Sequence, residues 1–561
     1  MPCWYPMEAL PVRRSRTVSV HAPRAAAVEL QVTDHSDGSV HTVAMELVEG
    51  RWTATVEAAD GDVYALFADG VGPLVDPSAA DVVFIADGPR AVFRGEWPQQ
   101  PPLGMHHQQP VVYETHVRGF GCTYGGVADR LDHLVHLGVN VIELMPVHPF
   151  DDSANYWGYM PVVWGAVHRG YAVDADGAGE LAALVAAAHE RSLEVWLDVV
   201  FNHTGEGDAS MPTWSLRGLD NAGAYLHQAD GSYNDDTGCG NTIDPSDPEV
   251  RRLVFEALDR YADLGIDGFR FDLASILTRD GGHLVHLIGD WAQRRGVVLV
   301  AEAWDLAAYQ VGVGFPDRRW AQWNDRFRDD VRGFLRAEPG KVPAMLHRVA
   351  GSPDLFPDNP ARSVNFITAH DGLTLFDLTT VTSDRHHSWD CGDALRPQML
   401  ANAFCLLLLS AGTPMFVMGD EFARTQHGHD NPYNIDSPLT WVDWNRLDEW
   451  RWLFDYVRAL LTLRRRAGAG LAAGAVRGYG VSDQPDESFE SRSLAWATDE
   501  LYVMANMWWE PLEFTVCEPG PWFVALTGAG GIAADASVVA GSSVSVPPRS
   551  ITVLTRETFL S

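Results

Sequence analysis

The segments Glu194–Val200 (EVWLDVV) and Gly268–Leu273 (GFRFDL) decide the fold of this chain. Both are short runs rich in apolar, β-branched and aromatic residues, as is typical of buried strands. Between them, residues 248–264 (PEVRRLVFEALDRYADL) carry apolar residues at helical spacing. A strand, a helix and a second strand in this order predict a βαβ unit and therefore a parallel sheet.

The same alternation of strands and helices continues on both sides of this unit. A further helix is predicted at residues 180–191. Eight βα repeats are the number that closes a TIM barrel, so the predicted fold class is α/β with a (β/α)8 barrel. A doubly wound open sheet is the alternative. The eight predicted strands cover residues 111–117, 141–147, 194–200, 268–273, 297–304, 321–325, 363–370 and 413–418.

Three regions follow one another along the chain. Residues 1–98 predict an N-terminal β-sandwich, because the runs 17–20, 27–32 and 52–56 alternate apolar and polar residues between Asp-Gly turn signals. Residues 99–468 form the predicted barrel, which begins with a linker at 99–102 and 106–110. Within it, residues 204–247 are rich in Gly, Asp and Asn and predict an inserted loop region over the barrel mouth. Residues 469–561 return to short strands and predict a C-terminal β-sandwich.

The chain is strongly acidic, with 41 Lys and Arg against 75 Asp and Glu and a formal charge of −34. Such a surface repels nucleic acids and anionic membranes, whereas a neutral sugar polymer meets no repulsion. Six cysteines without a close CxxC pair indicate neither a zinc site nor a disulfide framework. No apolar run is long enough for a signal peptide or a membrane span. We therefore expect a cytoplasmic protein without nucleic-acid or membrane partners.

Polar residues gather at the carboxyl ends of the predicted strands, where barrel enzymes build their sites. Asp272 ends the fourth strand and Glu302 lies near the end of the fifth, so the two acids can face each other across a pocket. Glycoside cleavage needs two carboxyl groups with different tasks, one to protonate the leaving oxygen and one to attack carbon or activate water. Arg270 lies two residues before Asp272, hence on the same face of the strand, where it can keep Asp272 ionised.

Several segments together resemble the α-amylase superfamily, and some narrow the resemblance to its isoamylase and glycogen-debranching branch. The superfamily segments are those that carry Asp198, Asp272, Glu302 and Asp371. The resemblance runs from about residue 15 to the end of the chain. The branch-specific segments are YETHVRG at 113–119, ELMPVH at 143–148, NYWGY at 155–159, SLRGLDN at 215–221, TGCGNT at 237–242, VNFITAHDGLT at 364–374 and GDEFARTQ at 419–426.

The resemblance implies a role for each matching residue. Asp272 matches the nucleophile, Glu302 the general acid/base, and Asp371 the third carboxylate, which stabilises the transition state. The remaining matches surround the sugar in subsite −1; they are the hydrogen-bonding residues Arg270, His203 and His370, the stacking residue Tyr159, and the supporting residues Asp198 and Asn202. The N-terminal sandwich resembles a glycogen-binding type of domain.

Each of these residues also has a purely structural interpretation. Asp272 can be a salt-bridge partner of Arg270, and Glu302 a capping carboxylate after its strand. Trp304 is a candidate lining residue of the sugar cleft, and so are Trp320 and Trp323, but core packing explains each of them equally well. No cofactor is expected. No metal is expected either, because the paired histidines lack companion ligands at zinc spacing and residues 273–276 (LASI) replace the Lys-His of calcium-binding α-amylases.

The main hypothesis is retaining hydrolysis of α-1,6 branch linkages in glycogen or its limit dextrins. Short malto-oligosaccharides are a further expected class of α-glucan substrate. Two departures from the branch leave the linkage open. Residues 380–396 are short beside the debranching relatives, and residues 164–171 match only loosely. Since loops at this end of a barrel select the substrate, an amylase, a pullulanase or a trehalose-pathway hydrolase stays an alternative. A non-catalytic glucan-binding protein is the more distant alternative.

Overall fold

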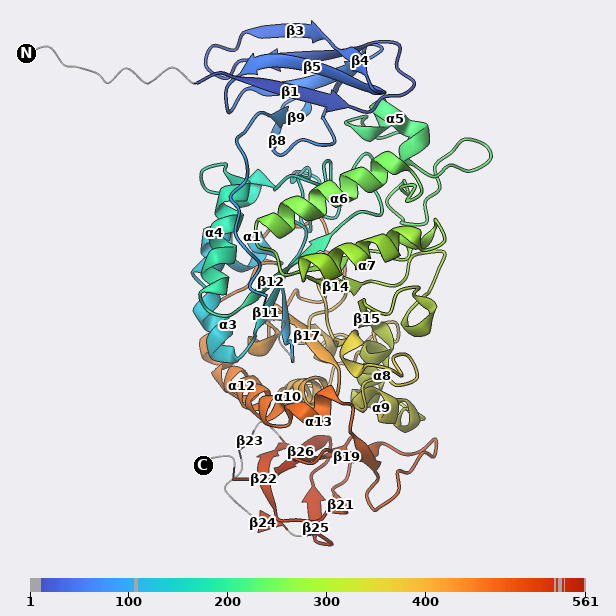
Figure 1. Cartoon of the computed structure of the whole chain (residues 1–561). Helices are drawn as coiled ribbons and strands as arrows, with labels where there is room; N and C mark the ends of the chain where they lie inside the picture. Colours follow the sequence, from blue (N-terminus) through green and yellow to red (C-terminus); the bar gives the residue numbers. More distant parts are fainter. Residues whose placement is uncertain (1–11, 105–108, 529–530, 533–536, 539, 559–561) are drawn as a thin grey trace, which may run out of the picture.

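The chain has three parts stacked along one long axis, with the barrel between two groups of antiparallel sheets (Figure 1). This computed structural model describes residues 12–104, 109–528, 531–532, 537–538 and 540–558. Part of the predicted linker, residues 105–108, lies outside the described residues, as does Cys3.

The N-terminal part is a β-sandwich of two sheets. Their strand orders are β1-β5-β4 and β3-β2-β6-β9-β8, with β7 paired to β6. Strand alternation places Val18, Leu30 and Leu66 between the sheets. The same core includes Val162 and Leu219 of the barrel region, so the sandwich is packed onto the barrel. The strands are β1 (Arg14–Val20), β2 (Val28–Thr33), β3 (Val40–Ala44), β4 (Glu46–Val48), β5 (Arg51–Ala58), β6 (Val63–Ala68), β7 (Val71–Leu74), β8 (Val82–Ile85) and β9 (Gly88–Val92).

The central part is a closed barrel of eight parallel strands in sequence order, which confirms the predicted TIM barrel. The second, fifth and seventh strands end three to five residues earlier than predicted, because pairing stops where the chain turns to form the barrel mouth. The strands are β10 (Val112–Thr115), β11 (Val141–Leu144), β12 (Glu194–Val199), β13 (Gly268–Phe271), β14 (Val298–Ala301), β15 (Ala321–Asn324), β16 (Ser363–Asn365) and β17 (Thr413–Val417).

Helices surround the barrel, and their ends follow local capping chemistry. In α6 the side chain of Asp247 accepts hydrogen bonds from the first turn and Pro248 occupies the first helical position. The helices are α1 (Val117–Gly121), α2 (Tyr124–Ala128), α3 (Leu131–Leu137), α4 (Gly177–His189), α5 (Leu216–Ala224), α6 (Pro248–Asp263), α7 (His283–Arg295), α8 (Asp325–Leu335), α9 (Val342–Val349), α10 (Arg396–Leu408), α11 (Arg446–Glu449), α12 (Arg451–Arg466) and α13 (Gly468–Ala472).

The side chains that point into the barrel change from apolar to charged along the strands. Val112, Val141 and Trp196 belong to one apolar cluster inside the barrel. Glu114 follows Val112 by two residues on β10 and therefore also points inward. On β13, Arg270 likewise follows Gly268, the register partner of Trp196, by two residues. Gly268 is required beside this cluster, since a β-carbon there would lie 2.6 Å from the Trp196 ring. The polar layer therefore rests on a packed apolar floor and faces the mouth of the barrel.

The inserted region after β12 is fastened to the N-terminal sandwich. The backbone of Val75 donates to the carbonyl of Trp214 at 2.7 Å, and the hydroxyl of Ser215 donates to the carbonyl of Val75. Buried Glu206 accepts hydrogen bonds from three backbone N–H groups of residues 214–217. These bonds hold the inserted region together and against the sandwich.

The C-terminal part is a second β-sandwich. Its larger sheet has the order β18-β19-β20-β26-β22-β23, with β24 paired to β22, and its smaller sheet pairs β21 with β25. The two sheets bury Trp522, Phe514 and Leu554 between them. The strands are β18 (Arg477–Tyr479), β19 (Ser493–Ala497), β20 (Leu501–Asn506), β21 (Leu512–Thr515), β22 (Trp522–Thr527), β23 (Gly531–Ile532), β24 (Ser537–Val538), β25 (Ser543–Val546) and β26 (Ser550–Thr555).

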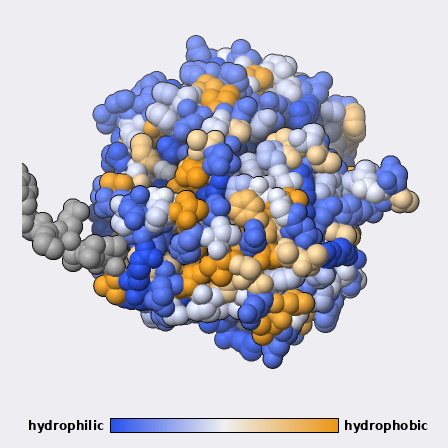
Figure 2. Space-filling model, turned by 90° about the horizontal axis from the view of Figure 1, so that it is seen from above, coloured by the Kyte–Doolittle hydropathy of each residue, from blue (hydrophilic) through white to orange (hydrophobic). Residues whose placement is uncertain are grey.

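The surface seen from the sandwich end is largely hydrophilic, with hydrophobic residues in small groups and short bands (Figure 2). Val40, Leu47 and Val71 of the N-terminal strands are among the large apolar residues that stay exposed. Among the described residues, no helix combines the length and the apolar character that a membrane crossing needs.

Candidate active site

A pocket opens at the carboxyl ends of the barrel strands, and six of the ten predicted site residues line it. Acids, bases and aromatic rings meet there, the combination that a sugar-cleaving site needs. The pocket is lined by Arg270, Asp272, Glu302, Trp304, Trp323, Arg328, Phe366, His370 and Asp371.

Arg270 is the centre of the site. Its Nη1 lies 2.8 Å from Asp198 and 3.1 Å from Asp272, and its Nη2 lies 2.8 Å from Glu302. The guanidinium also stacks over the Trp323 ring at 4.1 Å and is almost fully buried. One rigid fork thus holds both acids of the pair, an arrangement compatible with the separation of about 5–5.5 Å found in retaining glycosidases.

Two further groups fix the carboxyl groups of the pair. The side-chain amide of Asn202 donates to both the carboxylate and the backbone carbonyl of Asp272, each at 2.8 Å. The backbone N–H of Leu273 donates to Glu302 at 3.1 Å. Leu273 adopts a φ of 40°, a left-handed conformation that costs a leucine energy. The strained turn after β13 is therefore held in place by bonds to the pocket.

Burial and neighbouring charges shift the pKa values of two acids of the pocket, Glu302 and Asp371, in opposite directions. Burial raises the pKa of Glu302 to about 8; the charge of Arg270 opposes this rise and that of Asp272 adds to it. Burial also disfavours the charged form of Asp371, but the positive charges of His370 and Arg328 outweigh it and lower the pKa of Asp371. At neutral pH the site therefore holds a protonated Glu302 beside an ionised Asp371, as acid catalysis requires.

The other four predicted residues pack around the pocket. Asp198 accepts hydrogen bonds from Arg270 and from the Tyr159 hydroxyl, and burial raises its pKa to about 6. His203 bonds the side chain of Asn202 through Nδ1 and the carbonyl of Tyr159 through Nε2 at 2.7 Å. Both ring nitrogens of His203 are therefore occupied by protein groups, which favours a positioning role.

The aromatic residues predicted for the site differ in position, because some lie at the pocket and one lies in the core. Tyr159 is half-buried and stacks on His370 with ring centroids 4.9 Å apart. Trp304 and Trp323 line the pocket, whereas Trp320 is fully buried against Phe271 at 4.7 Å and belongs to the core.

Sequence reasoning missed Arg328 and Phe366 in the pocket and Glu114 behind it. Arg328 lies in the first turn of α8, the helix that follows the sixth strand, so it stands at the catalytic end of the barrel. Its guanidinium lies 5.7 Å from the Phe366 ring. The inward side of β10, read by alternation from Val112, is the signal that identifies Glu114.

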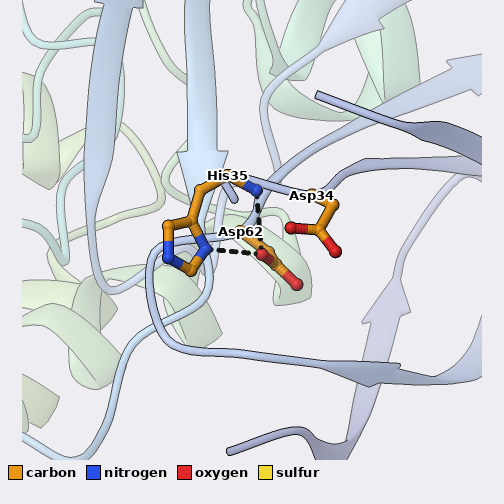
Figure 3. Close-up of side chains that lie close together, drawn as sticks. All are labelled: Asp34, His35 and Asp62. Atoms are coloured by element: carbon orange, nitrogen blue, oxygen red, sulfur yellow. Dashed lines mark hydrogen bonds and ion pairs between the residues drawn. The ribbon is translucent and has the colours of Figure 1, made fainter. Parts of the chain in front are cut away.

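One group of potential metal ligands occurs among the described residues, in the N-terminal sandwich (Figure 3). Asp62 accepts bonds from the backbone and the ring of His35 and from the backbone of Ala59. Asp34 pairs with Arg13 and accepts from Ser36. Since all four carboxylate oxygens already have donors and Arg13 neutralises one acid, the group is accounted for as a hydrogen-bonded turn.

Comparisons with known proteins show the family to which the chain belongs. The family model described as "Alpha amylase, catalytic domain" matches residues 111–216. The "Glycogen operon protein GlgX homolog" of Mycobacterium tuberculosis is 35% identical over 512 residues, covering 80% of this chain and 69% of that protein. The chain belongs to the isoamylase and glycogen-debranching branch of the α-amylase superfamily. "Isoamylase SU1, chloroplastic" of Zea mays is 36% identical over 435 residues, 63% of this chain and 55% of that protein.

Solved structures of pullulanases share the fold of this α-amylase superfamily member. The pullulanase from Anoxybacillus sp. LM18-11 superposes with a TM-score of 0.83 at 24% identity, over 99% of this chain and 86% of that protein. The Bacillus subtilis pullulanase type I complexed with maltose gives 0.82 at 24% identity, over 98% and 86%.

Proposed function

We propose that this glycoside hydrolase cleaves α-1,6 branch linkages of glycogen-type glucans with net retention. The observation that carries the proposal is the single guanidinium of Arg270, which joins Asp272 and Glu302 at the end of the barrel. The matches to a glycogen operon protein and to an isoamylase support the linkage.

In this mechanism Asp272 attacks the anomeric carbon while Glu302 donates its proton to the leaving oxygen. The sugar is then bound covalently to Asp272, and Glu302, now ionised, removes a proton from the incoming water. Attack by that water releases the sugar with its original configuration and returns both carboxyl groups to their starting states. Asp371, kept ionised by His370 and Arg328, stabilises the positive charge that develops on the ring.

The surrounding residues give this chemistry its geometry. Arg270 and Asn202 hold Asp272 from two sides, so the nucleophile has little freedom to rotate. Tyr159 and Trp304 are partly exposed and offer ring faces on which a glucose unit can pack. Trp323 is buried beneath the Arg270 guanidinium and supports that side chain instead.

The test is a product analysis with purified protein on glycogen, pullulan and linear amylose. Release of linear chains from glycogen with amylose untouched is the expected result. Maltose and short oligomers from amylose would instead establish an α-1,4 preference on the same catalytic apparatus. Binding without turnover on all three polymers would refute the hydrolase assignment.

We also propose that the protein is located in the cytoplasm. Among the described residues, Cys122, Cys239, Cys391, Cys405 and Cys517 are free thiols. Free thiols are the usual state in reducing compartments. Fractionation of cells that express the chain, with an antibody to it, tests the location.

A further inference from the structure

Two buried glutamates in the first two barrel strands have no part in the mechanism above. Glu114 of β10 and Glu143 of β11 are each only 1% exposed. They are partners in the register of the two strands, and each follows an inward-facing valine by two residues. Both side chains therefore point into the barrel, in the polar layer below the pocket.

Glu114 binds the ring of His370 directly. Its Oε1 lies 2.7 Å from Nδ1 of His370, whose side chain is 10% exposed at the pocket wall. Tyr159 stacks on the same ring, and Trp157 meets it edge-on at a centroid distance of 5.0 Å. A ring bound at one nitrogen and packed by two aromatic rings has a single orientation, in which Nε2 is left for the substrate.

Among the described residues, neither carboxyl oxygen of Glu143 has a hydrogen-bond partner, and the second oxygen of Glu114 has none. An ionised carboxylate buried without donors is strongly unfavourable, so one of two adjacent acids takes up a proton. Burial raises the pKa of Glu143 well above its usual range, and the charges of Glu114 and Asp198 raise it further. Glu143 is consequently neutral, and the negative charge of the pair resides on Glu114, which has the cationic partner.

The charge of His370 follows from its neighbours. Burial alone lowers the pKa of its ring, but the charge and the hydrogen bond of Glu114 outweigh burial and raise the pKa to about 9. Asp371 adds to this rise and Arg270 opposes it. The titratable and charged groups that face the ring from all packed elements are Glu114, Glu143, Tyr159, Asp198, Arg270 and Asp371.

We propose that Glu114 is a positioning residue that keeps His370 doubly protonated and fixed, with Glu143 beside it as a neutral acid. The inference rests on the proposed function, because it gives the imidazolium a task at the sugar of subsite −1. Doubly protonated His370 can only donate from Nε2 to a sugar hydroxyl, and its charge faces Asp371. The two glutamates thereby make His370 a hydrogen-bond donor in the pocket without contacting the substrate themselves.

The direct test is ¹⁵N NMR of histidine-labelled protein, with the His370 signals assigned by their loss in His370→Asn. In the wild type, the ring is expected to be doubly protonated at pH 7 and to titrate near pH 9. In Glu114→Gln it is expected to be neutral at pH 7, and in Glu143→Gln it should titrate as in the wild type. A neutral His370 in the wild type, or an unchanged titration in Glu114→Gln, overturns the proposal.

Kinetics on the best glucan substrate supply the second readout. Glu114→Gln should lower kcat/KM about 10- to 100-fold at pH 7.5, the effect of one lost charge-assisted hydrogen bond. The loss should shrink toward pH 5.5, where the ring regains its proton, and Glu114→Asp should restore much of the rate. A purely structural role would lower the rate by one factor at every pH, which contradicts the proposal.

The two readouts separate this inference from the proposed function. NMR reports the charge of His370 whether or not any glucan is cleaved. A wild type without turnover therefore refutes the function, whereas an unperturbed His370 titration in Glu114→Gln refutes only the role of Glu114.

Discussion

Replacing Arg270 by methionine is the perturbation with the largest predicted consequence. The substitution keeps much of the apolar stem but leaves three acids, Asp198, Asp272 and Glu302, without the cation that contacts each of them at 2.8–3.1 Å. Breaking a buried ion pair on one side costs about 3–5 kcal/mol. For a cooperative unit of about 370 residues, the unfolding entropy is about 0.8 kcal/mol/K, so Tm should fall by about 4–6 °C.

The decrease in Tm caused by Arg270→Met should depend on pH in a defined direction. Arg270 lowers the pKa of both Asp198 and Glu302, so its removal raises these values further above those of the unfolded chain, 3.8 and 4.5. An acid whose folded pKa is raised is more costly when ionised, and stability falls as pH rises from the unfolded toward the folded pKa. The Tm difference between variant and wild type should therefore be smaller at pH 5 than at pH 8.

Differential scanning calorimetry at both pH values measures the effect, with kcat/KM on glycogen measured in parallel. The rate should fall at least about 10³-fold, which corresponds to about 4 kcal/mol of lost transition-state stabilisation. Arg451→Met is the matched control, because Arg451 is half-exposed, pairs at the surface with Asp455 at 3.5 Å and lies 5.3 Å from the Phe454 ring, so it carries no buried charge. A variant at Arg270 whose Tm and pH dependence match this control would refute the reasoning.

Three further predictions address the same pocket. Asp272→Asn and Glu302→Gln should each lower kcat/KM by at least about 10³-fold, and near-full rates for both would refute the mechanism. In the wild type, kcat should decline above about pH 8, because Glu302 must be protonated to act as the acid; a flat profile from pH 6 to 10 would contradict this. Tyr159→Phe removes the hydroxyl that donates to Asp198 but keeps the ring, so kcat/KM should fall about 10-fold. Tyr159→Ala removes the ring as well and should lower kcat/KM further. Equal losses in the two variants would mean that the ring itself contributes nothing to kcat/KM.

The sequence predicted the barrel strands better than the points at which these strands end. All eight barrel strands were predictable, because buried parallel strands are short apolar runs with helices between them. Their carboxyl ends were not, since the stretch after Asn365 stays apolar for several residues although pairing has already ceased. The pattern of burial is the same in a strand and in a packed turn, so only the ladder of hydrogen bonds distinguishes them.

The sequence by itself determined the order of strands and helices, the (β/α)8 barrel and the position of Asp272 and Glu302 directly after their strands, because these depend on local periodicity. Only the tertiary structure decided which groups surround them. Arg270 bonds acids from three strands, Glu114 reaches His370 across 256 residues, and Arg328 enters the pocket from the following helix. Closure of the barrel brings the first strand next to the last, and no pattern along the chain encodes that contact. The charges of the pocket therefore follow from burial and from partners distant in sequence.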